Sequence, residues 1–269
     1  MAPSLEAVRA KLEKCGQGHL LAFYDKLADA DRAALLGRLD SLDVERATRI
    51  CRKSLRDLAD LEAGTGSKNA DLKPLPDSSF ASLVAVAGEG RGAGAAAAEE
   101  WEAEGLRQIA RGAVAVVVMA GGQGTRLGST DPKGCYDIKL PSRKSLFQLQ
   151  AERIARLQQL AARRLAQEAS ADRPVVIPWY VMTSGPTRGA TEKFFRDHRF
   201  FGLDPENVVF FEQANSLTLV NFLFDAEFQI SAAPDGNGGV YAALKTEKVL
   251  DDMDRRGIKY VHAYCVDNW

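Results

Sequence analysis

The chain has 269 residues, of which 46% are hydrophobic, so it can bury a sizeable core in one large domain or two small ones. Its formal net charge of −1 gives no bulk field that would attract nucleic acid or an acidic membrane. The cysteines at 15, 51, 135 and 265 lack Cys-x-x-Cys spacing, which argues against a metal knuckle and fits a reducing compartment. We find no signal-peptide pattern and no membrane-length apolar run, so we expect a soluble, cytoplasmic protein.

Residues 1–63 are expected to form a small helical unit. Apolar residues recur there at helical spacing, and charged residues occupy the opposite faces. Asp40 or Ser41, and then Asp43, are candidate N-caps for the last helix. The apolar stripe of that helix includes Ile50, Leu55, Leu58 and Leu61. A connector follows over residues 64–98, and its glycine- and alanine-rich part, 87–98, is interpreted as a mobile linker.

Residues 99–269 alternate between apolar runs and amphipathic segments, and we expect them to form one α/β domain. Helices are expected at 99–109, 145–169, 191–199 and 240–256, and strands at 113–118, 175–182, 208–211, 228–230 and 258–266. Pro178 interrupts the second of these strands, and a short extended piece is expected at 135–140. Alternation of strand and helix is typical of a sheet with parallel strands.

A glycine-rich loop follows the first expected strand. Residues 119–128 read Met-Ala-Gly-Gly-Gln-Gly-Thr-Arg-Leu-Gly, and Pro-Lys-Gly follows at 132–134. Glycines permit a tight turn and let backbone N–H groups approach a ligand closely. Arg126 and Lys133 add two positive charges, so the loop suits a polyphosphate, although a plain turn is the competing interpretation. The third glycine of the dinucleotide fingerprint is missing, and no Walker lysine follows.

Polar residues also stand at the ends of the other expected strands. These are Thr183-Ser184, Gln213 and Asp267-Asn268. Ligands of parallel α/β sheets bind outside the carboxyl ends of the strands. Since four polar clusters would belong to one sheet, we expect them to form one site.

Together, residues 120–128, 132–134 and 140–144 resemble a signature of the eukaryotic UDP-N-acetylglucosamine (UDP-N-acetylhexosamine) pyrophosphorylases. The resemblance runs from about Glu100 to Asn268. It implies a Rossmann-like nucleotidyltransferase sheet and a uridylyltransferase. The implied reaction converts UTP and N-acetylglucosamine 1-phosphate to UDP-N-acetylglucosamine and pyrophosphate, with Mg²⁺.

The resemblance also implies roles for residues of the loop. The nucleotide and its phosphates would be cradled by Gly121, Gly122 and Gly124, with support from Thr125. Arg126 would hold the leaving pyrophosphate, since a planar guanidinium suits bidentate phosphate contact. Lys133 would lie near the α-phosphate and the incoming phosphate. A surface ion pair for the arginine and a position after a turn proline for the lysine are the plainer interpretations.

Further roles follow from the resemblance for residues beyond the loop. Gln213 would read the uracil edge, since an amide supplies both a donor and an acceptor. Gly236 would contact the same ring by its backbone, and Asn237 would contact the sugar side. Asp267 would hold Mg²⁺, which proteins usually bind with one or two carboxylates plus substrate phosphates. Plain turn and cap residues are the competing interpretation here.

The chain departs from the family pattern in two places. The family continues for roughly as many residues again beyond Asn268, so we expect the C-terminal part of the family fold to be missing. Residues 214–232 are unusually apolar where the family has turn residues. Two alternatives stay open: a non-catalytic UTP-binding fragment or interaction module, and a nicotinamide-binding module, which the missing third glycine disfavours.

Overall fold

The chain forms two compact units in the computed structural model, Met1–Leu75 with Ser216–Ala233 and Pro76–Asn215 with Pro234–Trp269. The structure describes residues 3–64, 73–76, 79, 93–124, 128, 131–167, 174–213, 215–217, 232–234 and 238–268. Within these ranges, no helix is long and apolar enough to cross a membrane.

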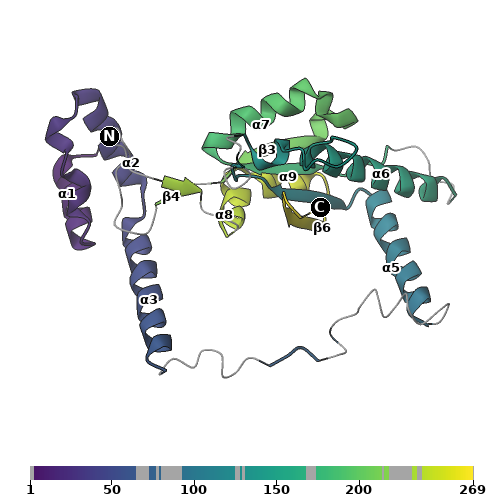
Figure 1. Cartoon of the computed structure of the whole chain (residues 1–269), viewed down its shortest axis with the longest axis horizontal. Helices are drawn as coiled ribbons and strands as arrows, with labels where there is room; N and C mark the ends of the chain where they lie inside the picture. The colour runs from purple at the N-terminus through teal and green to yellow at the C-terminus, as the bar shows by residue number, and fades with distance from the viewer. Residues whose placement is uncertain are drawn as a thin grey trace. The chain divides into compact units, whose positions relative to one another are not determined.

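The N-terminal segment of the first unit is helical, as expected (Figure 1). It contains α1 (Leu5–Lys14), η1 (Gly18–Leu21), η2 (Tyr24–Lys26), α2 (Asp29–Ser41) and α3 (Val44–Glu62). Asp43 caps α3, because its Oδ1 accepts a hydrogen bond from Arg46 N at 2.9 Å. The core of the unit includes Val8, Leu12, Leu20, Leu36, Leu39 and Val44. The apolar stripe of α3 is exposed beyond its first turns, with Leu55 at 61%.

A four-stranded parallel sheet forms the centre of the second unit, in the order β3-β2-β1-β6 (Figure 1). Its strands are β1 (Val114–Met119), β2 (Trp179–Thr183), β3 (Val208–Glu212) and β6 (Tyr260–Cys265). Met119 lies opposite both Met182 and Cys265, so the carboxyl ends of the strands share one edge. This arrangement confirms the α/β fold with parallel strands. A separate two-stranded sheet pairs β4 (Asn215–Leu217) with β5 (Ala232–Pro234).

Helices cover both faces of the parallel sheet, and the alternation along β1 shows how. Val116 and Val118 pack with side chains of α5 (Ala93–Ala110), α6 (Leu146–Gln167) and α7 (Gly185–Asp197). Ala115 and Val117 point to the opposite face, where they pack with α8 (Gly239–Thr246) and α9 (Val249–Arg255). Burial on both faces explains why the strand is apolar throughout. Short 3₁₀ turns complete the unit: η5 (Lys133–Cys135), η6 (Arg199–Gly202) and η7 (Pro205–Asn207).

Several boundaries differ from the expectations for physical reasons. β2 begins at Trp179 rather than at 175, because Pro178 has no N–H to donate, although its carbonyl accepts from Val116 N at 2.9 Å. α5 begins at Ala93, six residues before the expected start, within a run of alanines, the best helix formers. α7 begins at Gly185 rather than at 191, after a capping box on Ser184.

Two further expectations concern the C-terminal half of the chain. The helix expected over 240–256 is two helices, because Lys248 takes the left-handed conformation with φ of 56° between α8 and α9. The piece expected to be extended at 135–140 begins with the last residue of η5, and only Asp137 in it forms a bridge, to Ser145. The strand expected at 228–230 lies outside the described residues.

Tyr180 of β2 links the sheet to α9 by a partly buried hydrogen bond. Its hydroxyl donates to Asp252 Oδ2 at 2.8 Å, and Arg256 Nε donates to the same oxygen at 2.9 Å. Burial, with the hydrogen bond to Asp252, raises the pKa of Tyr180 above its ordinary value of 10.0. The folded chain therefore keeps a proton that the unfolded chain loses above about pH 10. This contribution to the free energy of unfolding is complete below that pH and falls above it.

Replacing Tyr180 by Phe is expected to lower the free energy of unfolding at pH 7 by about 1.5 to 3 kcal/mol, because Asp252 loses one donor. The decline in stability above about pH 10 should become shallower in Tyr180→Phe. Urea unfolding followed by circular dichroism measures both effects. Tyr241→Phe is the matched control, since Tyr241 on α8 is 78% exposed. Equal stability losses in the two variants would contradict the prediction.

Candidate functional site

Contacts at the carboxyl edge of the sheet join the polar residues that follow its four strands. Ser184 Oγ, after β2, donates to Gly121 O, after β1, at 2.7 Å. Gln213 N, after β3, donates to Thr183 O at 2.9 Å. Lys133 Nζ, in the segment after β1, lies 3.0 Å from Asp267 Oδ2, after β6. The strand-end residues therefore belong to one region, as the sequence predicted.

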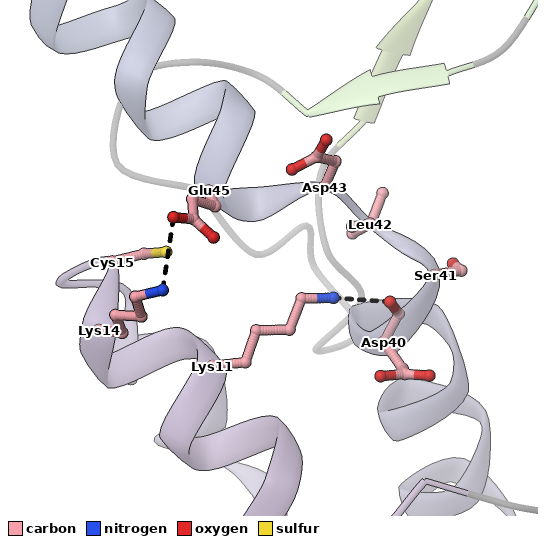
Figure 2. Close-up of a pocket in the computed structure, with 8 residues that line it drawn as sticks. All are labelled: Lys11, Lys14, Cys15, Asp40, Ser41, Leu42, Asp43 and Glu45. Carbon is pink, nitrogen blue, oxygen red and sulfur yellow. Dashed lines mark hydrogen bonds and ion pairs between the residues drawn. The ribbon is translucent and has the colours of Figure 1, made fainter.

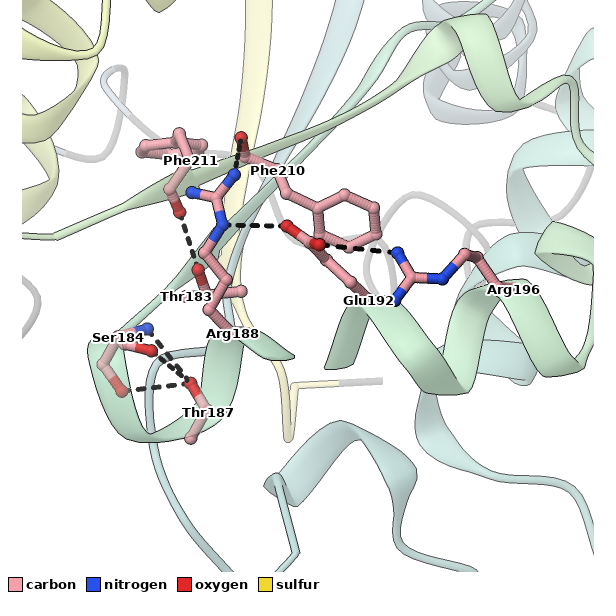
Figure 3. A network of polar contacts seen from close by, with 8 residues as sticks. All are labelled: Thr183, Ser184, Thr187, Arg188, Glu192, Arg196, Phe210 and Phe211. Atoms are coloured by element: carbon pink, nitrogen blue, oxygen red, sulfur yellow. Dashed lines mark hydrogen bonds and ion pairs between the residues drawn. The ribbon is translucent and has the colours of Figure 1, made fainter. Parts of the chain in front are cut away.

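A buried network around the start of α7 holds this edge (Figure 3). Ser184 N donates to Thr187 Oγ1 at 3.0 Å, which closes the first turn of the helix. Thr183 Oγ1 donates to Phe211 O on β3 at 3.0 Å. Arg188 extends the network, with Nε donating to Glu192 Oε1 at 2.8 Å. Because Ser184 Oγ also donates to Gly121 O, the network connects the glycine loop to the start of α7.

Gln213 is buried beside Gly121, and both were expected to bind the nucleotide. Its side chain is only 4% exposed, and its Oε1 has no hydrogen-bond partner in the described part of the chain. A Cβ at position 121 would overlap Gln213 Nε2, so the amide lies directly against the glycine backbone. An unpaired buried acceptor is costly unless a ligand or water satisfies it. Beside Gly121, Gln213 therefore keeps an acceptor oxygen for a hydrogen bond from a ligand or a water molecule.

The glycine loop closes on the segment that carries Lys133. Gly124 N donates to Asp131 O at 2.9 Å, and Lys133 N donates to Gly122 O at 3.1 Å. The amide of Gly124 is therefore used to close the loop. Over the ranges that the structure describes, the amides of Gly121 and Gly122 donate to no backbone acceptor. Thr125, Arg126, Gly236 and Asn237 lie outside the described residues.

Lys133 and Asp267 form an ion pair at the rim of the site. The side chain of Lys133 is 26% exposed and that of Asp267 is 56% exposed. The hydrogen bond from Lys133 lowers the pKa of Asp267 below its ordinary value, so the carboxylate is ionised at neutral pH. Among the described residues, no group of three or more His, Cys, Asp or Glu side chains could hold a metal ion. A single carboxylate fits Mg²⁺ bound mainly by phosphates and water.

A pocket in the helical unit differs in character from the strand-end site (Figure 2). Its volume is about 470 Å³, and its lining residues are Lys11, Lys14, Cys15, Asp40, Ser41, Leu42, Asp43 and Glu45. Lys11 Nζ donates to Asp40 O at 2.6 Å, and Lys14 Nζ lies 3.4 Å from Glu45 Oε1. Both cations already have partners in the pocket wall, so the strand-end site remains the better candidate for anion chemistry.

Two residues of the site were not given a role from the sequence. Ser184 was noted only as part of a polar strand end, whereas its hydroxyl holds the glycine loop. Gln150 was not noted, and it is 2% exposed on the buried face of α6, with Nε2 donating to Val266 O at 2.8 Å. The available signal was its spacing, because Phe147, Gln150 and Ile154 lie on one helical stripe, where a polar residue needs a partner.

Comparison with known proteins gives a consistent picture. A family model described as UTP–glucose-1-phosphate uridylyltransferase matches residues 93–269. The chain is 46% identical over 269 residues to UDP-N-acetylhexosamine pyrophosphorylase-like protein 1 of Homo sapiens, covering 98% of this chain and 50% of that protein. It is 43% identical over 261 residues to UDP-N-acetylglucosamine pyrophosphorylase of Saccharomyces cerevisiae, covering 95% and 51%.

A solved structure supports the same comparison. The crystal structure of uridine diphosphate N-acetylglucosamine pyrophosphorylase from Trypanosoma brucei, in complex with an inhibitor, superposes with a TM-score of 0.76 at 30% identity. The match covers 100% of this chain and 53% of that one. The chain thus spans about half the length of the curated relatives it matches.

Proposed function

We propose a uridylyltransferase reaction for this chain because it belongs to the UTP–glucose-1-phosphate uridylyltransferase family. The relatives at 43 to 46% identity are named for UDP-N-acetylglucosamine or UDP-N-acetylhexosamine. The proposed substrates are therefore UTP and N-acetylglucosamine 1-phosphate, and the products are UDP-N-acetylglucosamine and pyrophosphate. A cytoplasmic location is part of the proposal, supported by four cysteines that form no disulfide.

The proposal rests on three features that lie along one edge of the sheet. They are the buried side-chain amide of Gln213, the glycine turn at 121–122, and the ion pair of Lys133 with Asp267. Gln213 would read the uracil edge with its side-chain donor and acceptor. The backbone amides of Gly121 and Gly122 would face the nucleotide. Gly124 and Thr125 complete this loop, and Gly236 and Asn237 are proposed for the uracil and the sugar by resemblance alone.

The chemistry needs positioning and charge neutralisation more than a protein nucleophile. A phosphate oxygen of the sugar phosphate attacks the α-phosphorus of UTP, and pyrophosphate leaves from the opposite side. The attacking oxygen is already anionic, so no strong general base is required. Lys133 and Arg126 would neutralise phosphate charge, the former near the α-phosphate and the latter at the leaving pyrophosphate.

Asp267 would hold Mg²⁺ in this proposal. Bound there, the cation would neutralise phosphate charge and polarise the phosphoryl oxygens. Lys133 keeps the carboxylate ionised and in place before the substrates bind. When a phosphate arrives, the ammonium of Lys133 has a second anion to pair with, and the carboxylate is left free for the cation.

The test is pyrophosphate release by the purified chain with UTP, N-acetylglucosamine 1-phosphate and Mg²⁺, and with UTP alone as the blank. Release that requires the sugar phosphate is the expected result. Binding of UTP without release, from a chain shown to be folded, would favour the non-catalytic alternative. A thermal shift with NADH but not with UTP would favour the nicotinamide-binding alternative instead.

A further inference from the structure

We propose that Gln150 is a positioning residue that holds Asp267 in place beside Lys133. The role matters for catalysis only if Asp267 has the part given to it in the proposed function. Gln150 lies on α6, is 2% exposed, and is 116 residues away in sequence from its acceptor, Val266 O. It touches no group that would react, so it would act through the turn that carries the carboxylate.

The turn after β6 is held through both backbone polar groups of Val266, the residue that precedes Asp267. Val266 N donates to Met119 O, at the end of β1, at 3.2 Å. Val266 O accepts from Gln150 Nε2 at 2.8 Å. Asn268 N donates to Cys265 O at 2.9 Å and closes the turn. The turn is therefore bonded to the end of β1 through Val266 N and to α6 through Val266 O.

The same face of α6 also contacts the segment that carries Lys133, the ion-pair partner of Asp267. Phe147 lies three residues before Gln150, so the two side chains share a helical face. A Cβ at Gly134 would overlap the Phe147 ring, which shows that the ring packs directly on the backbone next to Lys133. Phe147 is fully buried and packs edge-on against Trp179 and Phe195. One face of α6 thus contacts the backbone next to each member of the ion pair.

Packing alone would not explain a glutamine at this position. Val266 is 3% exposed, and Gln150 Oε1 is buried with no partner in the part of the chain that the structure describes. A methionine would fill nearly the same space without an unsatisfied acceptor. What glutamine adds is a donor for Val266 O, and no other donor reaches that oxygen among the described residues.

Amide hydrogen exchange of the ligand-free chain is the first test, with Gln150→Met as the variant. The amides of Val266 and Asn268 are expected to exchange about fivefold faster, since one buried hydrogen bond is lost. Gln158→Met is the matched control, because Gln158 Oε1 on the same helix accepts from Ile177 N at 2.9 Å, far along the helix. The control should leave exchange at 266 and 268 unchanged. Wild-type exchange there in Gln150→Met would overturn the proposal.

A conservative variant separates positioning from packing. In Gln150→Glu, a protonated carboxyl can donate to Val266 O, whereas an ionised one repels it. After correction for intrinsic exchange rates, protection of Asn268 N should match the wild type at low pH and fall as the glutamate ionises. Gln150→Met should show no such dependence on pH. Equal pH dependence in the two variants would count against the proposal.

Binding of Mn²⁺, a probe for Mg²⁺, in the presence of UTP gives the functional test. Gln150→Met should weaken Mn²⁺ binding about tenfold, and Gln158→Met should not. If the wild-type chain binds Mn²⁺ and Gln150→Met binds it equally well, the positioning role is wrong. If the wild-type chain binds no Mn²⁺ while the exchange difference is present, the proposed function fails and the positioning role stands.

Discussion

Replacing Asp267 by Asn is expected to lower the rate of pyrophosphate release about 100- to 1000-fold while leaving the chain folded. The amide keeps the shape of the side chain but removes the charge that would bind Mg²⁺. Lys133→Gln is expected to lower the rate by a similar factor, because a phosphate loses its cation. The side chain of Asp267 is more than half exposed, so loss of the ion pair should change stability little.

Rates of pyrophosphate release under saturating substrates check this prediction, together with circular dichroism for the fold. Lys139→Gln is the matched control for Lys133→Gln, since it removes the same charge from an exposed residue six positions along the chain. Full activity in Lys139→Gln with loss in Lys133→Gln would separate a local contact from a change in net charge. Near-normal rates in both Asp267→Asn and Lys133→Gln would exclude this pair from the chemistry.

The sheet and the meeting of its strand ends at one edge followed from the sequence because their signals are local. The apolar run 113–118 indicated a buried strand, and the structure has β1 at Val114–Met119. Parallel pairing then required that residues after each strand meet at one edge. The sequence predicts Ser184, Gln213 and Asp267 at this edge, and hydrogen bonds join them to the neighbouring strand ends or loops.

The side-chain partners were not predictable in the same way. Lys133 and Asp267 are 134 residues apart, and no local pattern records which residues meet across two strands. The bond from Gln150 to Val266 has the same long separation. The predicted start of α7 was wrong for a different reason. The helix begins with a capping box in which Thr187 takes the position where glutamate or glutamine is usual.

Replacing Gly121 by Ala is expected to weaken UTP binding about tenfold to a hundredfold. A Cβ at this position would overlap Gln213 Nε2, and Gln213 cannot withdraw freely because it is 4% exposed and its backbone is bonded to Thr183. The amide must rotate, and the two hydrogen bonds proposed for the uracil edge are then misaligned. Loss of two such bonds corresponds to about 1 to 3 kcal/mol of binding free energy.

Gly189→Ala is the control for this variant, because Gly189 is exposed on α7 and a Cβ at position 189 would meet nothing within 4 Å. Titration calorimetry with UTP should show weaker binding only for Gly121→Ala. The same variant should also lose preference for UTP over CTP, since Gln213 would no longer present its donor and acceptor to the base edge. Equal weakening in both glycine variants would show that the effect does not come from the contact with Gln213, and unchanged preference in Gly121→Ala would remove Gln213 from uracil recognition.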